Sequence, residues 1–153
     1  MIMLLPFRHL RAMRIIITAC TVLLAGCGTQ DAGERIYVEG IGSDGAPVEA
    51  IVDRSGLIDP ARVLACASCH GEDRRGLRSP IPEFGPYVAP DITPERLAVE
   101  IPGRRLPYNA ATLRRVLVDG ITSSGRRLHH PMPRWRMSDT DMQALVAYLL
   151  GGA

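Results

Sequence analysis

The sequence contains no lysine, and only 5% of its 153 residues are aromatic. With so few large rings, a core built from protein alone would be thin for a domain of this size. The net charge of +2 is small, and Arg8, Arg11 and Arg14 near the amino terminus account for it. Residues 27–153 carry 15 Arg against 16 acidic residues, which gives no argument for nucleic-acid binding.

The apolar run at residues 15–25 is too short to span a bilayer, and three arginines precede it. This arrangement predicts a signal peptide over residues 1–26. The run ends in Leu24-Ala25-Gly26-Cys27, which resembles a bacterial lipobox and predicts a lipid on the Cys27 thiol. We therefore expect an exported protein, lipid-anchored on the periplasmic side of a bacterial membrane. The alternative is an ordinary signal peptide followed by a chance cysteine.

A compact signal of this type would begin at Met13, so we hypothesise that translation starts there. Cys20 lies in the predicted leader and Cys27 at its cleavage site. Cys66 and Cys69 remain, and their close spacing leaves no pair for a long-range disulfide.

The strongest chemical signal is Cys66-Ala67-Ser68-Cys69-His70. Two thiols at i and i+3 lie on one face of a turn and can add to the two vinyl groups of one porphyrin. The adjacent imidazole would then be held beneath the iron. This is the c-type haem attachment pattern, and it predicts one covalent haem c, whose buried ring would supply the missing apolar area.

Two other chemistries use similar residues. A redox Cys-x-x-Cys motif is typical of a βαβ context, which is absent here. A tetrahedral zinc site needs four ligands. It would combine Cys66, Cys69 and His70 with His129 or His130, and it would be strained because His70 adjoins Cys69.

A second axial ligand must approach from the other side of the porphyrin. Met132 lies between Pro131 and Pro133, which stiffen the chain and can hold a weak thioether against iron. His130 is the second choice, and the remaining candidates are less suited or exposed: His129, Met137 and Met142.

The amino-terminal part of the exported chain predicts two features. Residues 27–35 are small and polar and are typical of a flexible tether. Residues 36–53 alternate around Asp44-Gly45, which predicts a β-hairpin at the start of a domain expected to span residues 36–153.

The remainder predicts a haem-binding core over residues 56–150 that is mainly helical. Short helices are expected after Asp59-Pro60, to Cys66, and over residues 94–100, with a long loop at residues 71–92. Two longer helices are expected, one from the cap Asn109 to Gly120 and one after Ser138. The last helix carries an apolar stripe: Met142, Leu145, Val146 and Leu149.

The chain resembles class I cytochrome c. The resemblance rests on the attachment motif with Gly71, on Pro131-Met132-Pro133 and on a terminal helix ending Ala147-Tyr148-Leu149. Residues 89–94, 113–120 and 125–128 are similar to haem modules of cytochrome subunits that serve periplasmic dehydrogenases.

The resemblance implies an all-α cytochrome c fold, here with the hairpin added. Its first and last helices would cross, with Tyr148 at the crossing. It also implies that His70 donates its other ring N–H to a backbone carbonyl, commonly that of a proline in the following loop. Pro80, Pro82 and Pro86 are candidates, and Pro86 is closest to the family pattern.

Donors for the haem propionates are expected just after the ligand segment. Trp135 and Arg136 are favoured, and Arg134 is a further candidate.

With both axial positions filled, the favoured function is single-electron transfer between redox proteins such as a dehydrogenase, an oxidase or another cytochrome. The alternatives are a haem enzyme whose iron site opens, and a sensor or a copper- or haem-delivery module.

Overall fold

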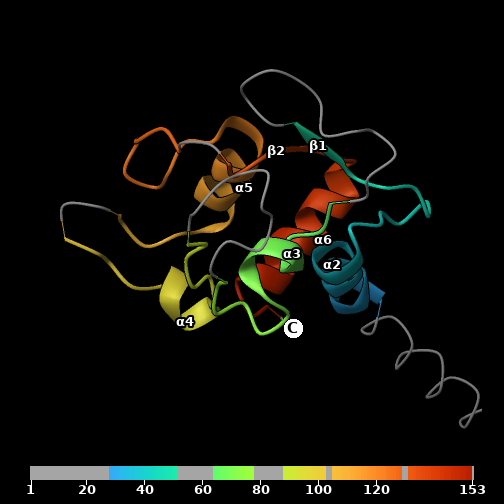
Figure 1. Ribbon diagram of the computed structural model, residues 1–153, viewed down its shortest axis with the longest axis horizontal. Helices are drawn as coiled ribbons and strands as arrows, with labels where there is room; N and C mark the ends of the chain where they lie inside the picture. Colours follow the sequence, from blue (N-terminus) through green and yellow to red (C-terminus); the bar gives the residue numbers. More distant parts are fainter. Residues whose placement is uncertain (1–27, 52–63, 78–87, 103–104, 129–130, 153) are drawn as a thin grey trace, which may run out of the picture.

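The computed structural model describes residues 28–51, 64–77, 88–102, 105–128 and 131–152 (Figure 1). Within these ranges the chain forms five helices and one two-stranded sheet, consistent with a mainly helical domain. The elements, in order, are α2 (Gly28–Glu39), β1 (Glu49–Ile51), α3 (Ala67–His70), α4 (Pro94–Leu97), α5 (Ala110–Asp119), β2 (Arg134–Arg136) and α6 (Asp139–Leu149). The predicted signal peptide, Cys27, His129 and His130 lie outside the described residues.

Helix α2 replaces both the predicted tether and the first predicted strand. Gly33, Ile36, Tyr37 and Gly40 are buried at the spacing i, i+3, i+4 and i+7, which is that of one helix face. The alternation of Ile36 and Val38 was therefore misleading, because the adjacent Ile36 and Tyr37 are both buried. The tether prediction was wrong since this segment has an apolar face to bury.

Helices α2 and α6 cross closely, so the helix that crosses the last one precedes the residues 56–150 on which the family resemblance rests. A Cβ atom on Gly33 would collide with the carbonyl oxygen of Ala144 and lie 2.7 Å from Cβ of Tyr148. The rings of Tyr37 and Tyr148 stack beside this point with their centroids 5.5 Å apart. The placement of Tyr148 at the crossing is confirmed.

The two longer predicted helices are confirmed with their caps. The Asn109 side chain accepts from the Thr112 N–H, and the Thr112 hydroxyl oxygen accepts from the Asn109 N–H. Gly120 ends α5 in the left-handed conformation. Ser138 caps α6, whose four predicted stripe residues are all buried.

The two short helices differ from expectation. The helix predicted to end at Cys66 lies mostly outside the described residues, and Leu64 and Ala65 are not helical. Helix α3 begins at Ala67 instead. Helix α4 begins at Pro94 as predicted but ends at Leu97.

The predicted hairpin over residues 36–53 was wrong, although its turn exists. The Gly42 N–H donates to the Ala46 carbonyl at 2.8 Å, closing a short loop around Asp44-Gly45. The following strand β1 then pairs with β2 in an antiparallel register that places Ala50 opposite Trp135. Strand β1 pairs with the distant strand β2 because the residues expected to pair with it locally belong to helix α2.

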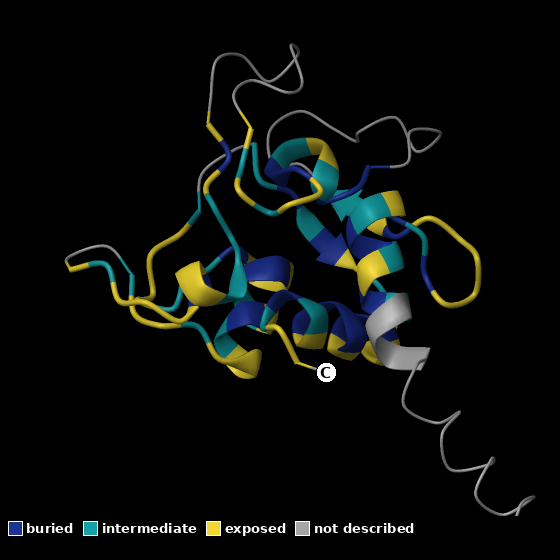
Figure 2. Cartoon of the chain, turned by 90° about the horizontal axis from the view of Figure 1, so that it is seen from below, coloured by how far each residue is buried: buried dark blue, intermediate teal, exposed yellow. Residues whose placement is uncertain are grey.

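The core gathers residues from α2, α5, α6 and the segments between them. Figure 2 shows buried faces of the helices turned inward and exposed faces turned outward. Within the described residues, no helix combines the length and hydrophobicity needed to cross a bilayer.

Candidate functional site: a haem cavity

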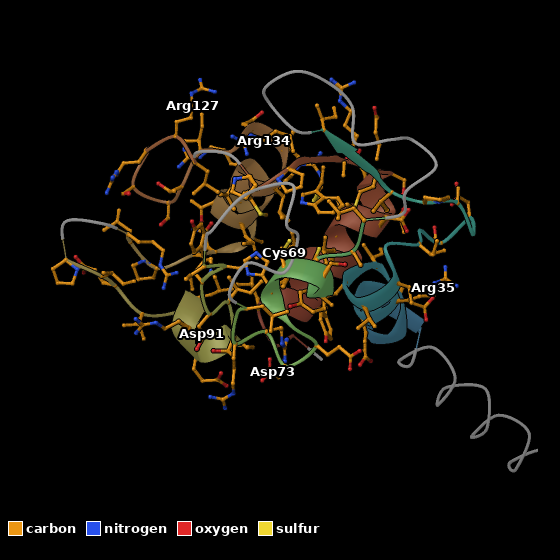
Figure 3. The ribbon with its side chains drawn as sticks, in the orientation of Figure 1. Arg35, Cys69, Asp73, Asp91, Arg127 and Arg134 are labelled. Carbon is orange, nitrogen blue, oxygen red and sulfur yellow. The ribbon has the colours of Figure 1, made fainter. Side chains whose placement is uncertain are left out.

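The attachment motif forms a tight turn at the middle of the molecule (Figure 3). The His70 N–H donates to the Cys66 carbonyl at 2.9 Å, and the Gly71 N–H to Ala67 at 2.8 Å. Gly71 then turns away with φ of 76°, a conformation that favours glycine. Cys66, Cys69 and His70 all line one cavity as a result.

The turn is also bonded to the helix crossing. The buried Tyr37 hydroxyl donates to the Gly71 carbonyl at 2.7 Å. The Arg74 guanidinium lies 4.7 Å from the Tyr148 ring centroid and donates to the Tyr148 carbonyl. These contacts connect the position of His70 to that of α2 and α6.

His70 is held in a defined tautomer. Its Nδ1 lies 2.9 Å from the Pro90 carbonyl oxygen, and since a carbonyl only accepts, Nδ1 carries the proton. Burial lowers the pKa of His70 and outweighs the opposing bond to Pro90. The imidazole is therefore neutral, and Nε2 keeps a lone pair for a metal.

The identity of this proline corrects the sequence analysis. Gly76 and Ala89 approach so closely that a Cβ on Gly76 would collide with the Ala89 carbonyl. The Ala89 N–H donates to Leu77, and the Ile92 N–H to Arg74. This pairing brings the Pro90 carbonyl to His70, so the carbonyl belongs to none of the three candidate prolines, of which Pro86 was the closest to the family pattern. Pro80, Pro82 and Pro86 lie outside the described residues.

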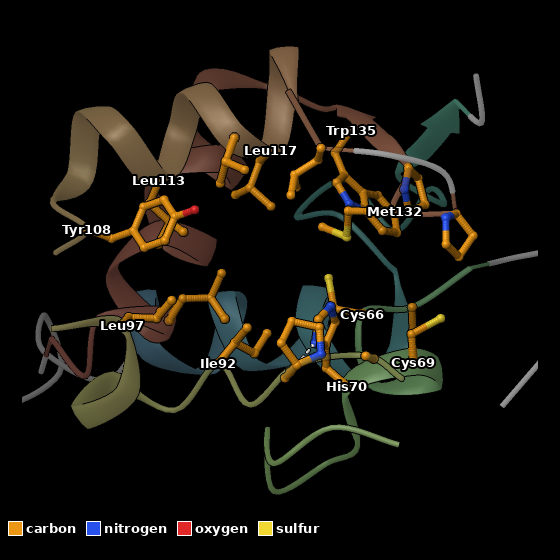
Figure 4. A pocket seen from close by; sticks show the side chains of 18 of the residues that line it. Cys66, Cys69, His70, Ile92, Leu97, Tyr108, Leu113, Leu117, Met132 and Trp135 are labelled. Atoms are coloured by element: carbon orange, nitrogen blue, oxygen red, sulfur yellow. Dashed lines mark hydrogen bonds between the residues drawn. The ribbon is translucent and has the colours of Figure 1, made fainter. Parts of the chain in front are cut away.

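Met132 lies across the cavity from His70 (Figure 4). The wall that carries it also contains Leu117, Leu128 and Trp135. Met137 and Met142 pack against or within the core and do not line the cavity. Of the methionines in the described residues, Met132 therefore lies where the sequence analysis requires the second ligand.

The cavity between these walls has a volume of about 340 Å³, within the size range of cofactor sites. Most of its lining is apolar. Ile92 and Leu97 lie on the His70 side, and Tyr108 and Leu113 close one end (Figure 4).

The cysteines do not have the properties of an activated redox pair. Burial raises the pKa of the Cys66 thiol to about 12, with Cys69 adding to the increase and a backbone hydrogen bond opposing it. A reactive Cys-x-x-Cys needs the opposite shift. Within the described ranges, no group of three His, Cys, Asp or Glu side chains is arranged to hold a metal ion.

Two cavity-lining side chains carry buried donors without a partner in the described part of the chain. They are Nε1 of Trp135, which is 2% exposed, and Nε of Arg105. Buried donors are rarely left unsatisfied, so an acceptor in the cavity is expected for the Trp135 N–H, whereas the Arg105 guanidinium also donates to the Arg96 and Val99 carbonyls. Trp135 was predicted for this role. Arg105 was missed because it lies far before the ligand segment.

The two other predicted donors point elsewhere. Arg136 is exposed and does not line the cavity. Arg134 donates to the Leu128 and Met132 carbonyls instead. Alternation along β2 buries Trp135 and leaves the arginines on the other face.

These features fit a haem. The cavity offers two thiols at one edge, a neutral imidazole, a thioether opposite it and unpartnered donors suited to propionate oxygens. Cys66, Cys69, His70 and Met132 are the residues that would hold the group.

Comparison with known families gives an independent result. The family model described as Cytochrome C oxidase, cbb3-type, subunit III matches residues 61–149, which is more than half of the chain. Comparisons with curated proteins and with solved structures found no significant match. Helix α2 and strand β1 precede the matched residues, while the attachment motif and Met132 fall within them. The chain therefore belongs to this cytochrome c family, and it is a class I c-type cytochrome.

Proposed function

We propose that this cytochrome carries single electrons on one covalently bound haem c. Cys66 and Cys69 would form the two thioether bonds, and His70 and Met132 would be the axial ligands. The observation that carries this proposal is the pair of facing ligand side chains, one of which already has its tautomer fixed by the Pro90 carbonyl.

The cavity supports a carrier more than a catalyst. Haem supplies the one-electron chemistry when it is bound. The apolar lining would shield the group from water, His70 and Met132 would occupy both axial positions, and the neutral Met132 thioether would favour the reduced state. Partners would be other redox proteins, such as a dehydrogenase, an oxidase or a second cytochrome.

The test is to express the full chain in a host that attaches haem c and to measure haem per polypeptide. One haem per chain is expected, with the weak long-wavelength ferric band of methionine-ligated iron. Met132→Ala should remove this band, lower the reduction potential and allow carbon monoxide to bind the ferrous form. Met137→Ala is the matched control, because Met137 packs outside the cavity. A colourless protein, or an unchanged spectrum in Met132→Ala, would refute the assignment.

We also propose that a lipid on Cys27 holds the cytochrome at the membrane. The signal peptide and lipobox in the sequence support this. Cys27→Ser should move the protein from the membrane fraction to the soluble fraction and abolish labelling by a radioactive fatty acid. Membrane retention of the Cys27→Ser variant would count against the anchor.

A further inference from the structure

Arg134 makes an unusual set of contacts for the first residue of a surface-edge strand. Its Nη1 donates to the Met132 carbonyl at 2.8 Å, and its Nη2 donates to the Leu128 carbonyl at 3.0 Å. One planar guanidinium therefore links the carbonyl of Met132, the proposed ligand, to the carbonyl of Leu128 four residues earlier. A guanidinium can do this because its donors point in fixed, divergent directions.

The guanidinium packs against Gly120, and backbone bonds fix the segments on either side of it. A Cβ atom on Gly120 would collide with Arg134 Cζ, so the group packs directly on the glycine that ends α5. The Leu128 N–H donates to the Gly120 carbonyl at 2.7 Å. The backbone of Arg134 is paired with Ile51 in the sheet.

We infer that Arg134 is a positioning residue that keeps the Met132 thioether in place for iron, an inference that rests on the proposed His70/Met132 ligation. The two hydrogen bonds fix residues 128 and 132 relative to each other and to the end of α5. Arg134 does not line the cavity, so it acts through the backbone of Met132.

The direct test replaces Arg134 by Met in the full holoprotein. Methionine keeps much of the length but donates no hydrogen bond. A hydrogen bond to a charged group contributes enough that its loss should raise the population with Met132 detached by about tenfold or more. Carbon monoxide should bind the ferrous form at least about tenfold faster, and the ferric Met–iron band should disappear at lower pH. The haem content should stay at the wild-type value.

Arg127→Met is the matched control for charge. Arg127 is exposed and adjoins Leu128, whereas Arg134 is half-buried; Figure 3 labels both side chains. This variant removes the same charge from the same segment and should bind carbon monoxide like the wild type. Arg134→Lys should restore the behaviour only in part, because one ammonium replaces a fork of donors.

A second pair of variants displaces the guanidinium without changing it. Gly120→Ala puts a methyl group where Arg134 Cζ lies, whereas Gly125→Ala has no atom within 4 Å of the added carbon. Both glycines have positive φ, 67° and 80°, so an alanine adds backbone strain in both variants, and only Gly120→Ala adds the collision with Arg134. Faster carbon monoxide binding in Gly120→Ala alone would support the inference even if Arg134→Met failed to fold.

The outcomes distinguish failure of the proposed His70/Met132 ligation from failure of the proposed role of Arg134. A wild-type protein without the Met–iron band would refute the proposed ligation itself. A wild-type protein with the band, together with unchanged binding in Arg134→Met, would overturn the role of Arg134. Equal effects of Gly120→Ala and Gly125→Ala would also overturn it, since strain alone would then explain them.

Discussion

The two walls of the haem cavity are built in different ways. The His70 wall is a single turn in which both cysteines and the histidine are sequence neighbours, and Tyr37 and Pro90 bond it from outside. The Met132 wall depends on Arg134 and on strand pairing between β1 and β2. The first wall thus places three proposed haem-binding residues on one hydrogen-bonded turn, whereas the second wall offers a single thioether on a non-helical segment held by the Arg134 side chain. We therefore expect a destabilising change to displace Met132 before it displaces His70.

The clearest difference between the two walls should appear when each proposed axial ligand is removed in turn. His70→Ala should abolish nearly all haem incorporation, because the attachment turn loses its iron contact and its bond to Pro90. Met132→Ala should retain covalent haem with an open position. The measurement is haem per polypeptide after purification. Equal loss of haem in both variants would mean that the walls do not differ.

The next largest effect is expected at the helix crossing beneath the His70 wall. Gly33→Ala should reduce the free energy of unfolding by about 2–3 kcal/mol, since the added carbon meets the immobile Ala144 carbonyl. In an exposed helix the same change would stabilise the protein by about 1 kcal/mol. Thermal unfolding of the holoprotein measures the difference, with Gly152→Ala as the control near the carboxyl terminus. An increase in stability would show that the crossing is looser than described.

A smaller effect should follow from the bond between the crossing and the attachment turn. Tyr37→Phe removes the buried hydroxyl that donates to Gly71 and leaves that carbonyl unsatisfied. A loss of about 1–2 kcal/mol is expected in the free energy of unfolding by denaturant. Tyr148→Phe removes a hydroxyl from the other ring of the stack and should have little effect. Comparable losses in both variants would argue that the Gly71 bond is unimportant.

The smallest expected effect is on the pH dependence of stability, through Asp141, which accepts a hydrogen bond from Ser43 in the loop before β1. Burial alone would raise the pKa of Asp141, but hydrogen bonds from Ser138 and Ser43 outweigh it and lower the pKa below its usual value. A lowered pKa contributes stability above the unfolded value near pH 4, and this contribution is lost as the pH falls through the folded value. Asp141→Asn should therefore flatten the acid side of the stability curve. An unchanged acid slope would exclude this contribution.

Sequence-based prediction was most accurate for features that depend on residues close together in the chain. The attachment motif, the Asn109 and Ser138 caps and the stripe on α6 each follow from local spacing, and all lie where they were expected. Met132, which was chosen for its flanking prolines, lies on the cavity wall opposite His70, and its role as a ligand stays a prediction.

The sequence predicted poorly where long-range packing decides. The small polar residues of α2 were taken for a tether because their helical face is completed only by α6. Strand β1 could not be paired with β2 from local patterns, since more than 80 residues separate them. Pro90 reaches His70 only because its loop pairs with residues 74–77, and Arg105 lies beside Tyr108 in a separate segment before α5.

Helix α2 has a consequence for how the cytochrome would meet its partners. It begins at Gly28, one residue after the cysteine proposed to carry the lipid, and it is packed on α6. With no slack segment in between, the acyl chains would set the tilt of the whole domain and not merely its distance from the bilayer. The cavity would then sample fewer orientations relative to the lipid surface than it would on a flexible tether, which would favour electron exchange with proteins held at that same surface.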